Sequence, residues 1–181
     1  MTKNILMKYN HNRLPITSDF SSFFSLLERS FPLKEFRTKE GQQSLFLQEE
    51  YQLMLLKNTE DAVLALLSYW DFPGFYFIEH FAVDPDFRGG GIGGKLLHKI
   101  TQQAEKDIFL EVAPPSSNMA KRRIAFYERN GFVLNDYDHV QPPLRPGSPS
   151  IPLRIMSYPQ RADRKTLRQT VDILYQYVYQ I

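Results

Sequence analysis

Five glycines cluster in the middle of the chain, where a strand-like run gives way to a helix-like run. They lie in residues 88–95, which read Arg-Gly-Gly-Gly-Ile-Gly-Gly-Lys. Backbone N–H groups at the start of a helix attract anions, and glycine lets a ligand approach the backbone closely. An ordinary turn does not need five glycines, because each costs ordering entropy on folding. The segment, called the glycine turn below, therefore predicts a phosphate site.

The glycine turn also matches two known phosphate-binding sequence patterns, but the residues that flank it argue against both. Gly89, Gly94 and Lys95 match G-x-x-x-x-G-K, but Leu96 stands where a P-loop needs Ser or Thr to hold Mg²⁺. The dinucleotide pattern G-x-G-x-x-G also matches, but residues 84–88 separate the strand from the first glycine. A nucleotide-binding protein stays open as a minor alternative.

Three further side chains carry groups that can move protons. Tyr127 stands near the end of a helix-like run, and a phenol is protonated at neutral pH. Glu79 lies on the strand-like run before the glycines, and Glu111 interrupts another apolar run. Burial beside apolar neighbours would raise the pKa of either carboxyl group toward that of a general base. Each residue also has a structural interpretation, a core tyrosine or a partly exposed strand residue. Strand alternation predicts that His80 faces away from Glu79.

The elements that must position these residues follow from hydrophobic periodicity and turn signals. Apolar residues at three- and four-residue spacing predict a first helix, with Ser18 or Asp19 as its N-cap. Gly131 is expected to end a later helix in the left-handed conformation. The predicted helices are 20–31, 93–106, 119–130 and 162–181; the predicted strands are 44–48, 52–57, 62–69, 75–83, 108–112 and one starting at 132; the predicted loops are 37–43 and the Pro-rich 141–152.

Length and composition narrow the class of protein. The 181 residues suit one domain, which we place at 1–158, followed by a helical extension at 159–181 that packs on the domain or on a partner subunit. A formal charge of +2 gives no field that would favour nucleic acid. Zero cysteines and four histidines without ligand spacing predict no metal. We also expect no signal peptide, no membrane span and a cytoplasmic location.

Two segments together resemble the GNAT superfamily of N-acetyltransferases. Residues 81–93, Phe-Ala-Val-Asp-Pro-Asp-Phe-Arg-Gly-Gly-Gly-Ile-Gly, resemble motif A, whose signature Q/R-x-x-G-x-G/A follows a strand; Arg88, Gly91 and Gly93 fill it. Residues 126–132, Phe-Tyr-Glu-Arg-Asn-Gly-Phe, resemble motif B, a helix end with a Tyr followed by Gly-Phe. The resemblance implies an α/β (α+β) fold, in which a central, mixed, mostly antiparallel twisted sheet is flanked by helices. A C-terminal amphipathic helix would complete it.

The resemblance also implies roles for particular residues. The strand end at 81–83 would splay at a bulge and bind the pantetheine arm, and a main-chain N–H near Val83 would meet the developing oxyanion. The glycine turn would bind the pyrophosphate of acetyl-CoA, the co-substrate. Tyr127 would be the general acid, and Glu79 or Glu111 the general base. The residues expected to contact the co-substrate are Phe81, Ala82, Val83, Arg88, Gly89, Gly90, Gly91, Ile92, Gly93, Gly94, Lys95 and Asn118.

The expected function is direct acetyl transfer from acetyl-CoA to an amine. The acceptor is a small amine or a protein amine, flanked by residues 20–43 and 141–152 if the resemblance holds, and a homodimer is possible. The alternative from another class is a non-catalytic acyl-CoA-binding or protein-interaction module with a GNAT-like fold. A pure binder needs only the glycine turn, whereas Tyr127 together with a candidate base favours an enzyme.

Overall fold

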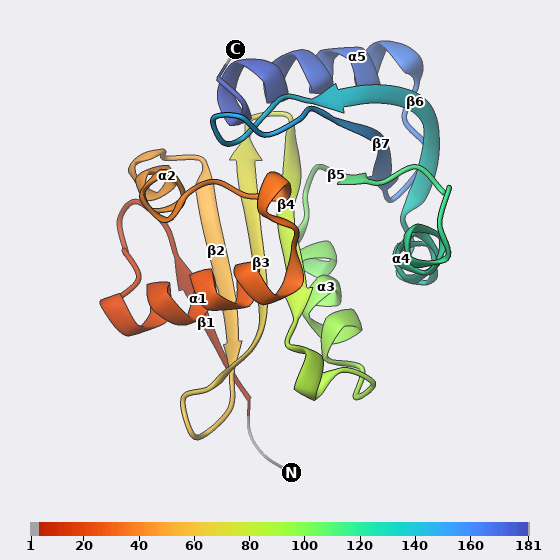
Figure 1. Cartoon of the computed structure of the whole chain (residues 1–181). Coiled ribbons are helices and arrows are strands. Elements are labelled where there is room, and N and C mark those ends of the chain that lie inside the picture. The colour runs from red at the N-terminus through yellow and green to blue at the C-terminus, as the bar shows by residue number, and fades with distance from the viewer. Residues whose placement is uncertain (1–3, 181) are drawn as a thin grey trace. The chain divides into compact units, whose positions relative to one another are not determined.

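Two compact units make up the chain, one ending at Lys106 and the other beginning at Asp107. The computed structural model describes residues 4–180. In the first unit, antiparallel strands pair in the order β1 (Ile5–Tyr9), β2 (Tyr51–Lys57), β3 (Val63–Phe72) and β4 (Phe75–Val83) (Figure 1). Its helices are α1 (Thr17–Ser30), α2 (Lys39–Ser44) and α3 (Ile92–Gln103), with 3-10 turns η1 (Leu33–Glu35), η2 (Leu45–Leu47) and η3 (Pro85–Phe87).

The second unit is a smaller antiparallel sheet with helices. Strand β7 (Ile151–Tyr158) pairs with β5 (Asp107–Val112) on one side and with β6 (Val133–Gln141) on the other. Its helices are α4 (Asn118–Arg129), α5 (Arg164–Ile173) and η4 (Leu174–Val178), a π-helix that continues α5. The expected antiparallel sheet with flanking helices is confirmed within both units, while β1 and β7 lie outside the predicted strands. Across residues 4–180, no helix combines the length and apolarity needed to cross a membrane.

Strand β3 is apolar along most of its length because both of its faces are buried. Of its ten residues, all but Tyr69 and Asp71 are buried, so side chains on both faces of the strand are covered. Alternation of apolar and polar residues is expected only where one face meets water. Both α1 and α3 pack on β3, which provides that cover.

The start of α1 differs from the prediction. The helix begins at Thr17 with Ile16 at the N-cap position, and no side chain caps it. Asp19 is instead buried, where it accepts hydrogen bonds from the Tyr9 hydroxyl and the Lys57 ammonium group. A carboxylate that binds two donors from β1 and β2 is stabilised more than one that caps a helix in water. Burial and Asp19 raise the pKa of Tyr9 to about 12.

The segment between α1 and β2 corrects two further predictions. The predicted loop 37–43 contains most of α2, which Thr38 caps by accepting a hydrogen bond from the Gly41 N–H at 3.1 Å. The predicted strand 44–48 is the 3-10 turn η2, which buries Leu45 and Phe46. The Phe46 ring packs edge-on against Tyr51 at 5.1 Å between centroids, and this tertiary contact overrides the strand-like composition of so short a run.

The end of the chain folds against the second unit. The predicted amphipathic helix is confirmed over α5 and η4, and its apolar side chains Leu167, Val171, Leu174 and Val178 are buried. Figure 1 shows α5 running along β6, and the two elements are in contact. The Tyr175 hydroxyl donates to the Val140 carbonyl at 2.7 Å, which ties η4 to β6.

Candidate active site

The glycine turn joins η3 to α3 in a conformation that glycine alone adopts readily. Gly89 and Gly91 have φ values of +87° and +71°, in the left-handed region. Gly91 is the N-cap of α3, and no side chain caps this helix. A Cβ atom added at Gly89, Gly90 or Gly91 would meet nothing within 4 Å. The first N–H groups of this twelve-residue helix therefore have no side-chain cap, and a helix start of this kind suits an anion.

The turn is held to the end of β4 by polar contacts. The Arg88 Nε donates to the Val83 carbonyl at 3.1 Å, so Arg88 also braces the turn besides bringing charge to it. Asp84 is buried, caps η3 by accepting from the Asp86 N–H at 3.1 Å, and forms an ion pair with Arg29 at 2.6 Å. These contacts fix where β4 ends relative to the glycines.

Glu79 lies at a β-bulge in the middle of β4. Ser68 of β3 pairs with His80 and Tyr69 pairs with Ile78, so Glu79 is the extra residue. Its carboxylate is buried, forms an ion pair with Arg37 and accepts a hydrogen bond from Trp70 Nε1 at 2.8 Å. Burial alone would raise the pKa of Glu79, but the Arg37 guanidinium outweighs it and holds this pKa below the ordinary value.

The same bulge overturns the expected placement of His80. Alternation predicted that His80 and Glu79 face opposite sides, but Nε2 of His80 lies 3.0 Å from the Glu35 carbonyl of η1. Its ring also packs on Phe31, at the end of α1. Glu79 meets Arg37 of the same connection, so both side chains point toward the segment between α1 and α2. An extra residue shifts the alternation by one, which brings the two neighbours to one face.

Tyr127 belongs to the second unit, on the last turn of α4. Its ring is 7% exposed and packs against Phe126 and Phe132, with centroids 5.4 and 5.7 Å away. Burial raises the pKa of Tyr127 to about 12, although Arg123 lowers it slightly, so the phenol keeps its proton throughout the neutral range. The predicted role of Gly131 is confirmed, because it follows α4 with a φ of +88°.

Glu111 is the last residue but one of β5, and its side chain is 11% exposed. One carboxylate oxygen lies 2.9 Å from His139 Nε2, and the other accepts a hydrogen bond from the Tyr179 hydroxyl at 2.5 Å. The two partners come from β6 and from the residue after η4. Sequence reasoning missed both, as it missed Arg37, because no local pattern marks a partner this far along the chain.

Asn118 belongs to the second unit, whereas the other predicted co-substrate residues belong to the first. It is the exposed first residue of α4, whose N-cap is Ser117; the Ser117 hydroxyl accepts from the Ala120 N–H at 3.1 Å. The predicted residues Phe81, Ala82 and Val83 form the end of β4, directly before the turn that holds Asp84. The first unit thus brings the strand end and the glycine turn together.

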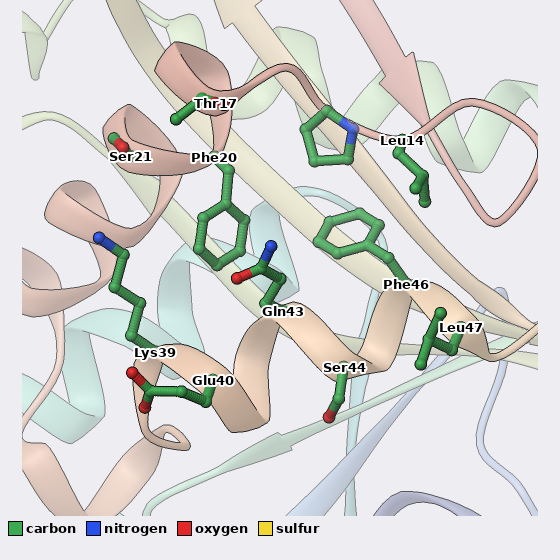
Figure 2. A pocket seen from close by; sticks show the side chains of 11 residues that line it. Leu14, Thr17, Phe20, Ser21, Lys39, Glu40, Gln43, Ser44, Phe46 and Leu47 are labelled. Carbon is green, nitrogen blue, oxygen red and sulfur yellow. The ribbon is translucent and has the colours of Figure 1, made fainter.

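A cavity of about 540 Å³ opens between the start of α1 and the segment of α2 and η2. Figure 2 shows Phe20 and Phe46 at its apolar side, with Lys39, Glu40 and Gln43 on the side of α2. It lies within the stretch 14–47, part of which was expected to flank the acceptor. None of the predicted catalytic or co-substrate residues lines this cavity.

Comparison with known proteins agrees with this geometry. The family model described as "Acetyltransferase (GNAT) family" matches residues 19–132. A curated relative from Bacillus subtilis (strain 168), named "Putative acetyltransferase YjbC", is 29% identical over 113 residues; the match spans 61% of this chain and 56% of that protein. A solved structure from Bacteroides thetaiotaomicron, described as a "Putative acetyltransferase from GNAT family", is 31% identical, covers 98% of this chain and 99% of its own, and has a TM-score of 0.84.

A more distant solved structure shares the fold. Arabidopsis thaliana NAA60, solved in complex with acetyl-CoA, is 12% identical, with 86% of this chain and 98% of its own covered and a TM-score of 0.62. The family model covers more than half of the chain and includes both the glycine turn and Tyr127. The chain therefore belongs to the GNAT acetyltransferase family.

Proposed function

We propose that this protein is an acetyl-CoA-dependent N-acetyltransferase that moves the acetyl group directly to an amine. The observation that carries the proposal is the glycine turn, where left-handed Gly91 opens α3, no side chain caps the helix, and a Cβ added at Gly89, Gly90 or Gly91 would meet nothing within 4 Å. Such a helix start suits a pyrophosphate. The fold supports this assignment, because a structural neighbour was solved with acetyl-CoA bound.

In the proposed complex, the backbone contributes most of the contacts to the co-substrate. Residues 89–94 donate N–H groups to the pyrophosphate, and Arg88 adds positive charge while it braces the turn at Val83. Phe81, Ala82 and Val83 line the pantetheine arm, and a main-chain N–H near Val83 stabilises the oxyanion that forms on the thioester carbonyl. Asn118 contacts the co-substrate from the start of α4.

The chemical step then needs one acid and one base. The amine nitrogen attacks the thioester carbonyl carbon, the carbon–sulfur bond breaks, and the amine loses one proton while the departing thiolate gains one. Tyr127 gives the proton to the thiolate, since its phenol is protonated at neutral pH. No covalent intermediate with the protein is required.

Of the two candidate bases, Glu111 fits better than Glu79. Glu79 is held by Arg37 and Trp70, and its lowered pKa makes it a weak proton acceptor. Glu111 contacts a histidine and a tyrosine hydroxyl, and no arginine or lysine pairs with it among the ion pairs of the described residues. We therefore assign the base to Glu111 and a structural role to Glu79.

A thiol-release assay tests the proposed function. Purified protein, acetyl-CoA and a panel of small amines and peptide N-termini are mixed, and free coenzyme A is measured with a thiol reagent. The proposal predicts release that requires both an amine and intact Tyr127. Calorimetric binding of acetyl-CoA without release for any amine would indicate the non-catalytic module instead. A shift of the melting temperature by ATP or NAD, but not by acetyl-CoA, would contradict the co-substrate.

A further inference from the structure

The carboxylate of Glu111 is held from two sides by residues far apart in the sequence. His139 Nε2 lies 2.9 Å from Oε1, and the Tyr179 hydroxyl donates to Oε2 at 2.5 Å. The side chains of His139 and Glu111 are 3% and 11% exposed. Tyr179 is 68 residues away from Glu111 along the chain and follows the π-helix η4.

The sheet of the second unit explains how the three residues meet. On β7, Ile155 pairs with Glu111 and Leu153 pairs with His139, and residues two apart on a strand face the same side. Glu111 and His139 therefore lie on one face, on either side of β7. The Tyr175 ring packs near both His139 and Tyr179, with centroids 6.4 and 6.0 Å away, so η4 covers this group.

This arrangement is costly if it serves only to hold the fold. The contact between His139 and Glu111 is close but poorly directed, and Nδ1 of His139 is buried without a hydrogen-bond partner. Burying polar groups with incomplete hydrogen bonding is unfavourable, and apolar residues would fill the same space without that penalty. Buried polar groups of this kind are concentrated at functional sites.

We propose that His139 and Tyr179 are positioning residues that orient the Glu111 carboxylate as the base of acetyl transfer. The inference rests on the proposed function. A carboxylate offers about four acceptor positions, and here the Tyr179 hydroxyl fills one of them on Oε2 while Oε1 accepts no hydrogen bond, so positions remain for the amine or for a water that relays its proton. Tyr179 lies beyond the matched family segment 19–132, so the C-terminal helix completes the site.

The titratable groups that face Glu111 come from two elements. From β6 the titratable contact is His139, and from the C-terminal segment it is Tyr179, with Tyr175 behind both. On β7 the paired residues of this face are Leu153 and Ile155. Arg154 lies between them, hence on the other face, where its Nε binds Asp138 at 2.8 Å.

Tyr179→Phe and Tyr175→Phe form a matched pair that tests the proposal. Both remove one hydroxyl from the same helical segment, but the Tyr175 hydroxyl binds the Val140 carbonyl and leaves Glu111 untouched. We expect Tyr179→Phe to lower kcat about tenfold, the scale of one hydrogen bond to a charged group, with unchanged affinity for acetyl-CoA.

Tyr175→Phe should keep the kcat of the wild type and lose only thermal stability. An unchanged kcat in Tyr179→Phe, or the same change in both variants, would overturn the positioning role. His139→Gln, which keeps an N–H donor, should retain more activity than His139→Leu; equal losses would overturn the role of His139. Full activity of Glu111→Gln would overturn the proposal as a whole.

A spectroscopic readout separates this proposal from the proposed function. Carbon-13 NMR of labelled glutamate carboxyl groups reports the surroundings of the Glu111 carboxylate without turnover. We expect its resonance to shift in Tyr179→Phe, which loses the hydrogen bond, and to keep the wild-type position in Tyr175→Phe. If the wild type transfers no acetyl group, the proposed function fails while this measurement still decides whether Tyr179 binds the carboxylate. If transfer occurs and the Glu111 resonance is the same in wild type and Tyr179→Phe, the positioning role fails alone.

Discussion

Replacing Gly91 by alanine tests the co-substrate site through a single methyl group. Gly91 has a φ of +71° as the N-cap of α3, and an added Cβ meets nothing of the protein within 4 Å. Gly91→Ala therefore strains the backbone of the folded state but causes no steric clash. A left-handed residue with a Cβ costs about 1–2 kcal/mol, which lowers the Tm of a chain of this length by about 2–8 °C.

The effect on acetyl-CoA is separate from this strain. If the pyrophosphate lies against the N–H groups of the turn, the new methyl group occupies space that the ligand needs. We expect acetyl-CoA to bind at least about tenfold more weakly to Gly91→Ala, which corresponds to about 1.4 kcal/mol. Isothermal titration calorimetry measures this affinity, and scanning calorimetry measures the Tm of the same samples.

Two other glycines serve as matched controls. Gly147 has a φ of +77° and equally open space around its Cβ position, but it lies in the Pro-rich loop. Gly147→Ala should therefore lose similar stability and keep the affinity of the wild type. Gly90 is open without a positive φ, so Gly90→Ala places a methyl group in the turn with little strain. Equal acetyl-CoA affinities in Gly91→Ala and Gly147→Ala would refute the assignment of the pyrophosphate to this turn.

Three further predictions concern the chemistry and the stability of the fold. Tyr127→Phe keeps the ring and removes the acid, so kcat should fall by roughly 10²-fold in the thiol-release assay while acetyl-CoA affinity stays constant. Full turnover in this variant would mean that the thiolate takes its proton from another group. Glu79→Gln removes the carboxylate that Arg37 binds and should lower the free energy of unfolding by about 3 kcal/mol in urea at pH 7. Because the folded pKa of Glu79 is lowered, this contribution is complete above the ordinary pKa of 4.5 and disappears as pH falls through the folded value, so the wild type and variant should converge in acid. Leu174→Ala removes a fully buried side chain of η4 and should cost about 2–5 kcal/mol; a loss below 1 kcal/mol would show that the C-terminal segment adds little to the fold.

Local sequence was sufficient for the features that depend on neighbouring residues. Three such features were predictable: the glycine turn, the end of α4 at Gly131, and strand β4. Left-handed backbone, helix termination and an apolar run each depend on a few consecutive residues. The same holds for the amphipathic face of α5. These features also carried the resemblance to the GNAT family, so the family was recognisable before the fold was known.

Tertiary structure decided what depends on residues far apart. Asp19 binds Tyr9 and Lys57 instead of capping α1. Neither capping preferences nor residue spacing predict these two contacts. Phe46 turns a strand-like run into η2 because it packs on an aromatic cluster. Such contacts form between elements that meet only after folding, and their energy exceeds the small differences in local propensity.

The candidate base shows this division most clearly. The sequence by itself determined that Glu79 and Glu111 are carboxylates within apolar strands, and it treated them as near equivalents. In the folded protein, Glu79 contacts Arg37 and Trp70 at a bulge that no local sequence pattern predicts. Glu111 contacts His139 and Tyr179. A carboxylate's proton affinity depends on which charges and donors surround it in space, and only the tertiary structure brings those groups together.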